Sequence, residues 1–131
     1  MKPQDITSLE DIKLLVDTFY SKIQKDDMLG HIFEQHIQGR WPEHLEKMYR
    51  FWQTLLLEEY TYDGRPFPPH AKLPISKIHF DRWLSLFENT VNSLFEGEKA
   101  NEAIWRAQKM ALMFESKLDY IRNNPNKPLL F

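Results

Sequence analysis

The sequence predicts an all-α fold, because apolar residues recur at helical spacing in several long segments and no segment alternates like a half-buried strand. A chain of 131 residues suits one domain. We expect that domain to span residues 1–131, with its core at about 8–121 and a loose tail at 122–131. Nine Phe, five Tyr and four Trp suit either an aromatic core or a large flat apolar ligand, and composition alone favours the core.

The first long helix is expected from about residue 8 to residue 24. Ser8 is its expected N-cap, and Asp11 follows three residues later, which is a partial capping box. Two aspartates at residues 26 and 27 interrupt the pattern. A short helical turn is then expected at about 28–33.

Three further helices are expected along the rest of the chain. The second long helix begins at Pro42, which suits a first helical turn, and runs to about residue 57. A third spans about 76–95, with Gly97 as its expected stop. The last runs from about 99 to 121, with apolar residues along one face.

A loop is expected at residues 60–70, because one glycine and three prolines fall within residues 64–69 and no long helix continues through them. This loop ends at His70. Pro74 limits any helix that carries His70 to a short one.

Composition excludes several classes of function. The formal net charge of −2 offers no basic surface for nucleic acid. The absence of cysteine excludes disulfides, thiolate-bound zinc and iron–sulfur clusters. No signal-peptide core and no membrane-spanning stretch is evident. We therefore expect a cytoplasmic protein with no nucleic-acid partner and no membrane span.

The candidate chemistry rests on histidine. No nucleophile elbow, P-loop, HExxH or glycine-rich nucleotide turn is present. A metal site made of side chains alone would need three of the five histidines to converge, and none is paired at ligand spacing. Haem needs one imidazole and facing apolar rings. The histidines are His31, His36, His44, His70 and His79.

An ordered set of short segments makes a family resemblance visible. The segments are Phe19-Tyr20, Gly30 to Phe33, Trp41 to His44, Phe51-Trp52, Tyr62 to Pro66, His70 to Leu73, and Phe80 to Phe87. Together they resemble bacterial truncated haemoglobins, and group III most of all, over about residues 9–118. The glycine pairs typical of groups I and II are missing.

The resemblance implies a truncated globin fold, a two-over-two helical sandwich around haem b. It implies that His70 ligates the iron. On the opposite, distal side it places Tyr20, His44 and Trp83 as polar residues around the ligand, and Met48 as a wall of the ligand cavity. Without the family, Tyr20 is equally a core tyrosine and Trp83 a packing residue.

Further residues are expected to contact the haem. Phe33 matches the phenylalanine that packs on the haem face, and basic side chains are candidates for binding the propionates. The haem-contact residues are Phe33, Lys47, Phe51, Leu73, His79 and Phe80, with Lys72 and Arg82 as additional candidate cations.

The resemblance leads to a hypothesis of tight oxygen binding. Several donors around one ligand slow its release, which suits nitric oxide dioxygenation or peroxide chemistry and requires an electron donor that the sequence does not identify. Nitric oxide and carbon monoxide are further candidate ligands. The alternative is an oxygen storage, transport or sensing globin without turnover. A third reading is a helical interaction module without a cofactor.

Overall fold

The chain forms five α-helices in the part that the computed structural model describes, which comprises residues 3–67, 70 and 73–126. They are α1 (Leu9–Lys25), α2 (Gly30–Ile37), α3 (Trp41–Leu57), α4 (Lys77–Leu94) and α5 (Glu98–Asn123). Within these residues the only extended pairing is an isolated bridge between Gln4 and Phe95. The all-α prediction is confirmed. Residues 127–131 of the expected tail lie outside the described part.

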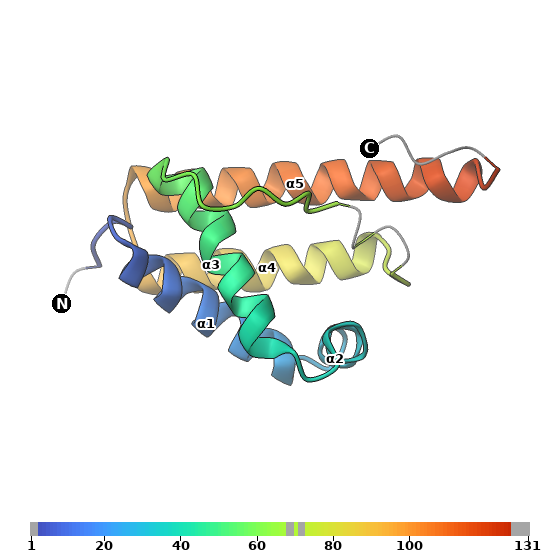
Figure 1. The fold of residues 1–131 in the computed structure, drawn as a ribbon, viewed down its shortest axis with the longest axis horizontal. Helices are drawn as coiled ribbons and strands as arrows, with labels where there is room; N and C mark the ends of the chain where they lie inside the picture. The colour runs from blue at the N-terminus through green and yellow to red at the C-terminus, as the bar shows by residue number, and fades with distance from the viewer. Residues whose placement is uncertain (1–2, 68–69, 71–72, 127–131) are drawn as a thin grey trace.

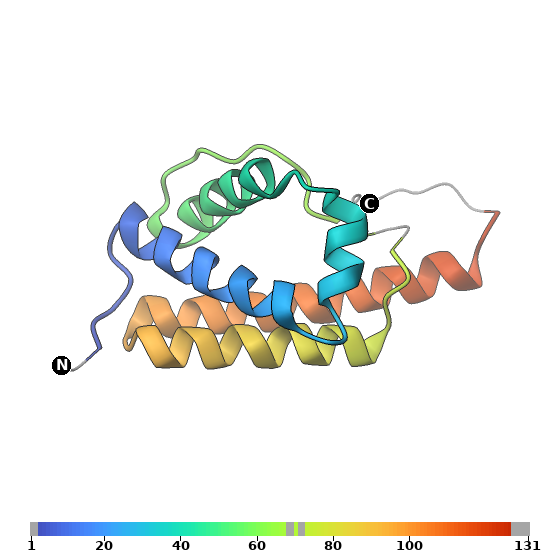
Figure 2. The ribbon, with the colours of Figure 1, turned by 90° about the horizontal axis from the view of Figure 1, so that it is seen from below.

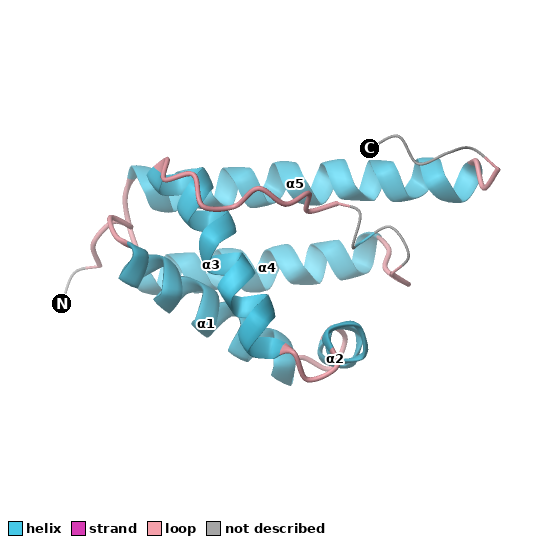
Figure 3. Cartoon of the chain, in the orientation of Figure 1, coloured by secondary structure: helices cyan, strands magenta, loops and turns pink. Residues whose placement is uncertain are grey.

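Two helical layers make up the fold. Helices α4 and α5 run side by side in opposite directions, and α1 and α3 cross them as a second layer (Figure 1). Seen from below, the short α2 lies at one end of the second layer, between α1 and α3 (Figure 2). The segment between α3 and α4 contains His70, and the residues of this segment that the structure describes form no α-helix (Figure 3). The predicted two-over-two arrangement is therefore confirmed.

Local capping explains where α1 and α4 begin. The backbone N–H of Asp11 donates to the Ser8 hydroxyl at 3.3 Å, as expected. In a full capping box the side chain of Asp11 would accept the N–H of Ser8. Here the Asp11 carboxylate instead accepts the N–H of Thr7 at 2.9 Å. In α4 the capping box is complete, with Ser76 and His79 bonding to each other's backbone N–H groups.

Helix α2 begins later and runs further than the expected turn at residues 28–33. The Asp26 carboxylate accepts the N–H groups of Met28 and Leu29 at 3.1 and 3.0 Å, which holds this stretch as a turn. The helix then begins at Gly30, where a Cβ would lie 2.8 Å from the carbonyl oxygen of Gln24. Close approach to the end of α1 therefore requires glycine at this position.

Gly97 does not stop α4, and that expectation is wrong. Helix α4 ends at Leu94, and Gly97 is the N-cap of α5 with φ of 142°. The Asp5 carboxylate accepts the N–H groups of Lys99 and Ala100, both at 2.9 Å. A side chain far away in the sequence thus caps α5, and it packs so closely on Gly97 that a Cβ there would clash.

The core falls into two clusters of buried side chains. The larger cluster fills the space between α1, α3, α4 and the first half of α5. The smaller cluster consists of Ile32, Phe67, Ile75, Phe80, Ala111, Phe114 and Leu118. Trp83 is half-buried and packs against both, so it marks their boundary. No helix in the described part of the chain is long and apolar enough to cross a membrane.

Candidate functional site

His70 lies in a tight turn of the segment between α3 and α4. Its backbone N–H donates to the carbonyl of Phe67 at 2.7 Å, and its own carbonyl accepts the N–H of Leu73 at 3.1 Å. The ring nitrogen Nδ1 lies 2.7 Å from the carbonyl oxygen of Pro66. A carbonyl only accepts, so Nδ1 carries the proton and the neutral ring has its lone pair on Nε2.

Aromatic side chains of the smaller cluster fix the plane of the His70 ring. The Phe114 ring on α5 lies with its centroid 4.8 Å from that of His70, and Phe67 lies 5.3 Å from Phe114. Leu73 and Phe80 also belong to this cluster or pack on it. Burial lowers the pKa of His70, because charge is disfavoured away from water, so the ring is neutral at pH 7. A neutral, oriented imidazole is the form that binds a metal.

A second group of rings lies where α1, α2 and α3 meet. The ring centroids of Tyr20 and His44 are 5.0 Å apart at 89°, an edge-to-face contact. Phe33 lies 6.0 Å from Tyr20, and Trp41 lies 5.8 Å from His44. The structure therefore brings together three residues that sequence reasoning placed near one ligand, and adds Trp41.

The imidazole of His44 has a buried nitrogen without a partner. Its Nε2 makes no hydrogen bond to any of the described residues. Burial first, and then the nearby charges of His36 and His70, lower the pKa of His44 to about 4. The ring is therefore neutral at pH 7, and leaving a buried polar atom unpaired costs about 1–3 kcal/mol.

The Tyr20 hydroxyl keeps its proton across the physiological range. Burial raises the pKa of Tyr20, because the phenolate would be poorly solvated. The side chain is only 6% exposed. Tyr20 is therefore available as a hydrogen-bond donor.

The other predicted distal and apolar residues, Met48, Phe51 and Trp83, belong to the larger core cluster or pack on it. Met48 is half-buried against the larger cluster, one turn after His44, and Phe51 is buried in that cluster. Trp83 stacks on Phe87 with centroids 5.6 Å apart and meets Phe19 edge-on at 5.6 Å. Its indole is thus held from α4 beside the residues of α1.

The predicted cations have other partners or stay at the surface. Lys47 is exposed on α3, near enough to His44 to contribute to its lowered pKa. His79 uses Nδ1 to accept the N–H of Ser76 at 3.0 Å, which leaves only Nε2 for another group. Arg82 is paired with Asp26 at 2.6 Å. Lys72 lies outside the described residues.

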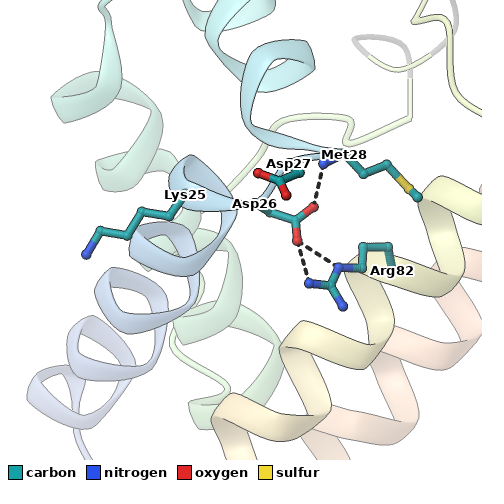
Figure 4. Close-up of a pocket in the computed structure, with 5 residues that line it drawn as sticks. All are labelled: Lys25, Asp26, Asp27, Met28 and Arg82. Atoms are coloured by element: carbon teal, nitrogen blue, oxygen red, sulfur yellow. Dashed lines mark hydrogen bonds and ion pairs between the residues drawn. The ribbon is translucent and has the colours of Figure 1, made fainter.

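A surface hollow of about 380 Å³ surrounds the Asp26–Arg82 pair, away from both histidine rings. Figure 4 shows two nitrogens of Arg82 directed at one oxygen of Asp26, while the other oxygen accepts the N–H of Met28. Burial alone would raise the pKa of Asp26, but the hydrogen bonds from Arg82, Leu29 and Met28 outweigh it and the pKa is lowered. The pair ties the α1–α2 turn to α4.

Sequence reasoning missed several residues of the two ring groups. Phe67, Phe114 and the Pro66 carbonyl orient His70, and Trp41 covers His44. The spacing of Trp41 and His44 on adjacent turns of α3 was a usable signal. No local signal marked Phe114, which approaches His70 from a distant helix. Among the described residues, no three side chains of the metal-binding types come together.

Comparison with known proteins identifies relatives over most of the chain. Residues 4–115 match the family model of bacterial-like globins. A group 3 truncated haemoglobin of Campylobacter jejuni is 38% identical over 113 residues, which cover 83% of this chain and 89% of that protein. The crystal structure of a group III truncated haemoglobin from Campylobacter jejuni superimposes with a TM-score of 0.83 at 36% identity, covering 89% of this chain and 95% of the other.

Proposed function

This chain belongs to the bacterial-like globin family, as a group III truncated haemoglobin, and from that premise we propose that it binds oxygen tightly at a haem b iron held by His70. Membership makes it a haem-binding globin for small gaseous ligands such as oxygen. The proposal adds three finer statements: the haem is of type b, His70 holds its iron, and oxygen is bound tightly. The observation that carries it is the buried, unpaired Nε2 of His44 beside Tyr20.

The residues present fit a haem. His70 has Nδ1 bonded to a backbone carbonyl, so its Nε2 lone pair would be available to hold the haem iron. Phe114 of the smaller cluster contacts His70, and the larger cluster contains Tyr20 with Phe33 packed on it, so apolar side chains are available for both faces of a macrocycle. His44 Nε2 is an orphaned polar atom that a polar ligand would satisfy.

The iron, when bound, supplies a coordination position for a diatomic ligand. The chain supplies the rest: His70 donates one lone pair, and its Nδ1 bond to Pro66 keeps the ring from turning. Tyr20 keeps its proton and donates a hydrogen bond to a partly negative ligand atom. His44 either donates from Nε2 or accepts there, depending on its tautomer. Phe33 and Trp41 exclude water from these bonds, which strengthens them.

Tight retention favours chemistry over delivery. A ligand held by more than one hydrogen bond leaves slowly, and a retained oxygen is available for reaction with nitric oxide, or the site for reaction with peroxide. Sustained turnover requires an electron donor, which is a further partner of this proposal. A storage, transport or sensing globin needs faster release.

The dissociation rate of oxygen from the reduced protein tests the proposal. Replacing Tyr20 with Phe removes one donor and keeps the ring, so oxygen should leave roughly ten- to a hundredfold faster. The control is Tyr62→Phe, which deletes the hydroxyl of a half-buried tyrosine whose ring contacts Phe51 instead of His44. Stopped-flow displacement of oxygen by carbon monoxide gives the rates.

Fast release from the unmutated protein, unaffected by Tyr20→Phe, would contradict tight binding and favour the delivery alternative. A second readout is the consumption of nitric oxide or peroxide by the haem-loaded protein with a chemical reductant. Catalytic consumption is expected, and stoichiometric consumption alone would leave a binding protein without turnover.

A further inference from the structure

The last turn of α5 holds the backbone that joins His70 to α4. Helix α5 extends past the start of α4, so its end lies beside the residues that precede α4 (Figures 1 and 2). Arg122 lies in this last turn, and its Nη2 donates to the carbonyl oxygen of Ile75 at 2.5 Å and to that of Leu73 at 3.3 Å. The two carbonyls come 47 and 49 residues earlier in the chain, so this contact is tertiary.

The two accepting carbonyls are bonded in turn to the backbone of His70. The His70 carbonyl accepts the N–H of Leu73 at 3.1 Å, and the Leu73 carbonyl accepts the N–H of Ile75 at 2.9 Å. Pro74 separates these two residues and has no N–H, which limits the backbone hydrogen bonds that can hold this stretch. A continuous series of hydrogen bonds therefore runs from the Arg122 guanidinium to the backbone of His70.

Arg122 acts on a different part of the His70 region from the contacts described above. The Pro66 carbonyl and the Phe114 ring both contact the imidazole itself, at 2.7 Å and with a centroid distance of 4.8 Å. Arg122 instead holds the chain that follows His70. Because Phe114 and Arg122 are about two turns apart, roughly 12 Å along α5, one helix fixes both the ring and the backbone after it.

We propose that Arg122 is a positioning residue for the iron ligand: it holds the backbone of Leu73 and Ile75 against α5 and thereby keeps the His70 imidazole in one direction. The inference rests on the proposed function in one respect, which is that His70 holds the iron. Hydrogen bonds from a charged donor are stronger than neutral ones. The Arg122 side chain is exposed, so its removal deletes these bonds without leaving a cavity in the core. The His70 segment should therefore loosen while the helices stay folded.

Resonance Raman spectroscopy of the reduced, haem-loaded full chain tests the proposal through the stretching band of the iron–histidine bond. The unmutated chain should show one narrow band. Arg122→Met keeps a long apolar side chain and removes the donors, so the band should broaden or shift as the imidazole takes up more than one direction. The rate of haem transfer to an excess of a haem-scavenging apoprotein should rise about three- to tenfold. Arg122→Lys keeps a charged donor and should restore both readouts in part.

The control for both readouts is Arg106→Met, the same change at another arginine of α5. Arg106 is paired with Glu102 at 2.7 Å, in the first half of the helix. Its replacement should leave the iron–histidine band and the rate of haem transfer unchanged. A band and a rate in Arg122→Met equal to those of the unmutated chain would overturn the proposal. Equal changes in Arg122→Met and Arg106→Met would do the same.

Amide hydrogen exchange separates positioning of the ligand from stabilisation of the loop. In the carbon monoxide form of Arg122→Met, the N–H groups of Leu73 and Ile75 should exchange about three- to tenfold faster, while that of Phe80 in α4 keeps its protection. Faster exchange with an unchanged iron–histidine band would mean that Arg122 only stabilises the loop, and would contradict the positioning role. Absence of this band from the unmutated protein is a different result, because it would remove the premise that His70 holds the iron.

Discussion

The two half-buried histidines of the candidate site are held in opposite ways. His70 is fixed by the backbone: its Nδ1 bonds to the Pro66 carbonyl at 2.7 Å and its ring lies on Phe114. His44 is held by edge-to-face contacts with Tyr20 and Trp41, and its Nε2 has no partner among the described residues. The His70 ring is therefore already oriented for a bond from Nε2. The His44 ring, in contrast, has an Nε2 that can still form a hydrogen bond.

This difference suits the two histidines to different roles. A ligand to iron must be neutral, oriented and rigid, which suits His70. A residue that senses a small ligand gains most when it is unsatisfied without that ligand, which suits His44. The following changes disturb one region at a time, in order of decreasing effect.

Phe114→Ala should give the largest loss of stability. The ring is 6% exposed and lies between His70 and Phe67, so its removal leaves a cavity and should cost about 3–5 kcal/mol. The matched change in the His44 region is Phe33→Ala. The Phe33 ring is only half-buried, so this change should lower the free energy of unfolding by less. Urea unfolding measures both. Equal losses would mean that the His70 region is no more tightly packed than the His44 region.

Acid should destabilise the haem-free protein through His44. Because the folded pKa of about 4 lies below the ordinary 6.5, this contribution is fully present above about pH 6.5 and is lost as pH falls towards 4. The full loss is on the order of 3 kcal/mol. Urea unfolding at about pH 7.5 and about pH 5 should show a smaller loss in His44→Gln than in the unmutated chain.

The control for that measurement is His31→Gln, at an exposed histidine on α2, which should keep the full pH dependence. An unchanged pH dependence in His44→Gln would contradict the burial of a neutral His44 ring. A direct check is the histidine NMR titration of the same protein.

Asp26→Asn should give a smaller loss. The carboxylate is 4% exposed and accepts hydrogen bonds from Arg82 and from two backbone N–H groups, so the change should cost about 1–3 kcal/mol. Its pKa is lowered, so this stability is present above the ordinary carboxyl pKa and is lost as pH falls through the lowered value.

Asp27→Asn is the matched control, because Asp27 is exposed and lies next to Asp26 in the sequence. Thermal unfolding of both variants should show a clear loss for Asp26→Asn and almost none for Asp27→Asn. Indistinguishable variants would mean that the ion pair does not tie the α1–α2 turn to α4.

Much of the fold was predictable from the sequence, because its signals are local. The expected bounds of α1, α3, α4 and α5 are within one or two residues of the observed ones, since apolar periodicity and caps such as Ser8 and Ser76 lie inside or beside each helix. The start of α2 and the role of Gly97 could not be predicted from apolar periodicity. They depend on the backbone hydrogen bonds that the Asp26 and Asp5 carboxylates accept in the folded chain. Asp5 caps a helix that begins more than ninety residues later.

The residue types of the candidate site were predictable from the sequence, but the orientation of their side chains was not. The family pattern named Tyr20, His44 and His70, and the structure places the first two in contact. The Pro66 bond and the Phe114 contact depend on how a loop without regular structure returns to α5, which no periodicity encodes. The same holds for Trp83, whose place between the two core clusters follows from packing.

The most direct test of the central claim is the visible absorption spectrum of the reduced protein, with and without carbon monoxide, in three forms. The unmutated chain and His44→Ala should both show an intense Soret band that shifts with carbon monoxide, because His44 is assigned to the ligand side. His70→Ala should lose haem or show altered ligation. A normal, carbon-monoxide-sensitive spectrum in His70→Ala together with haem loss in His44→Ala would reverse the two roles and contradict the account.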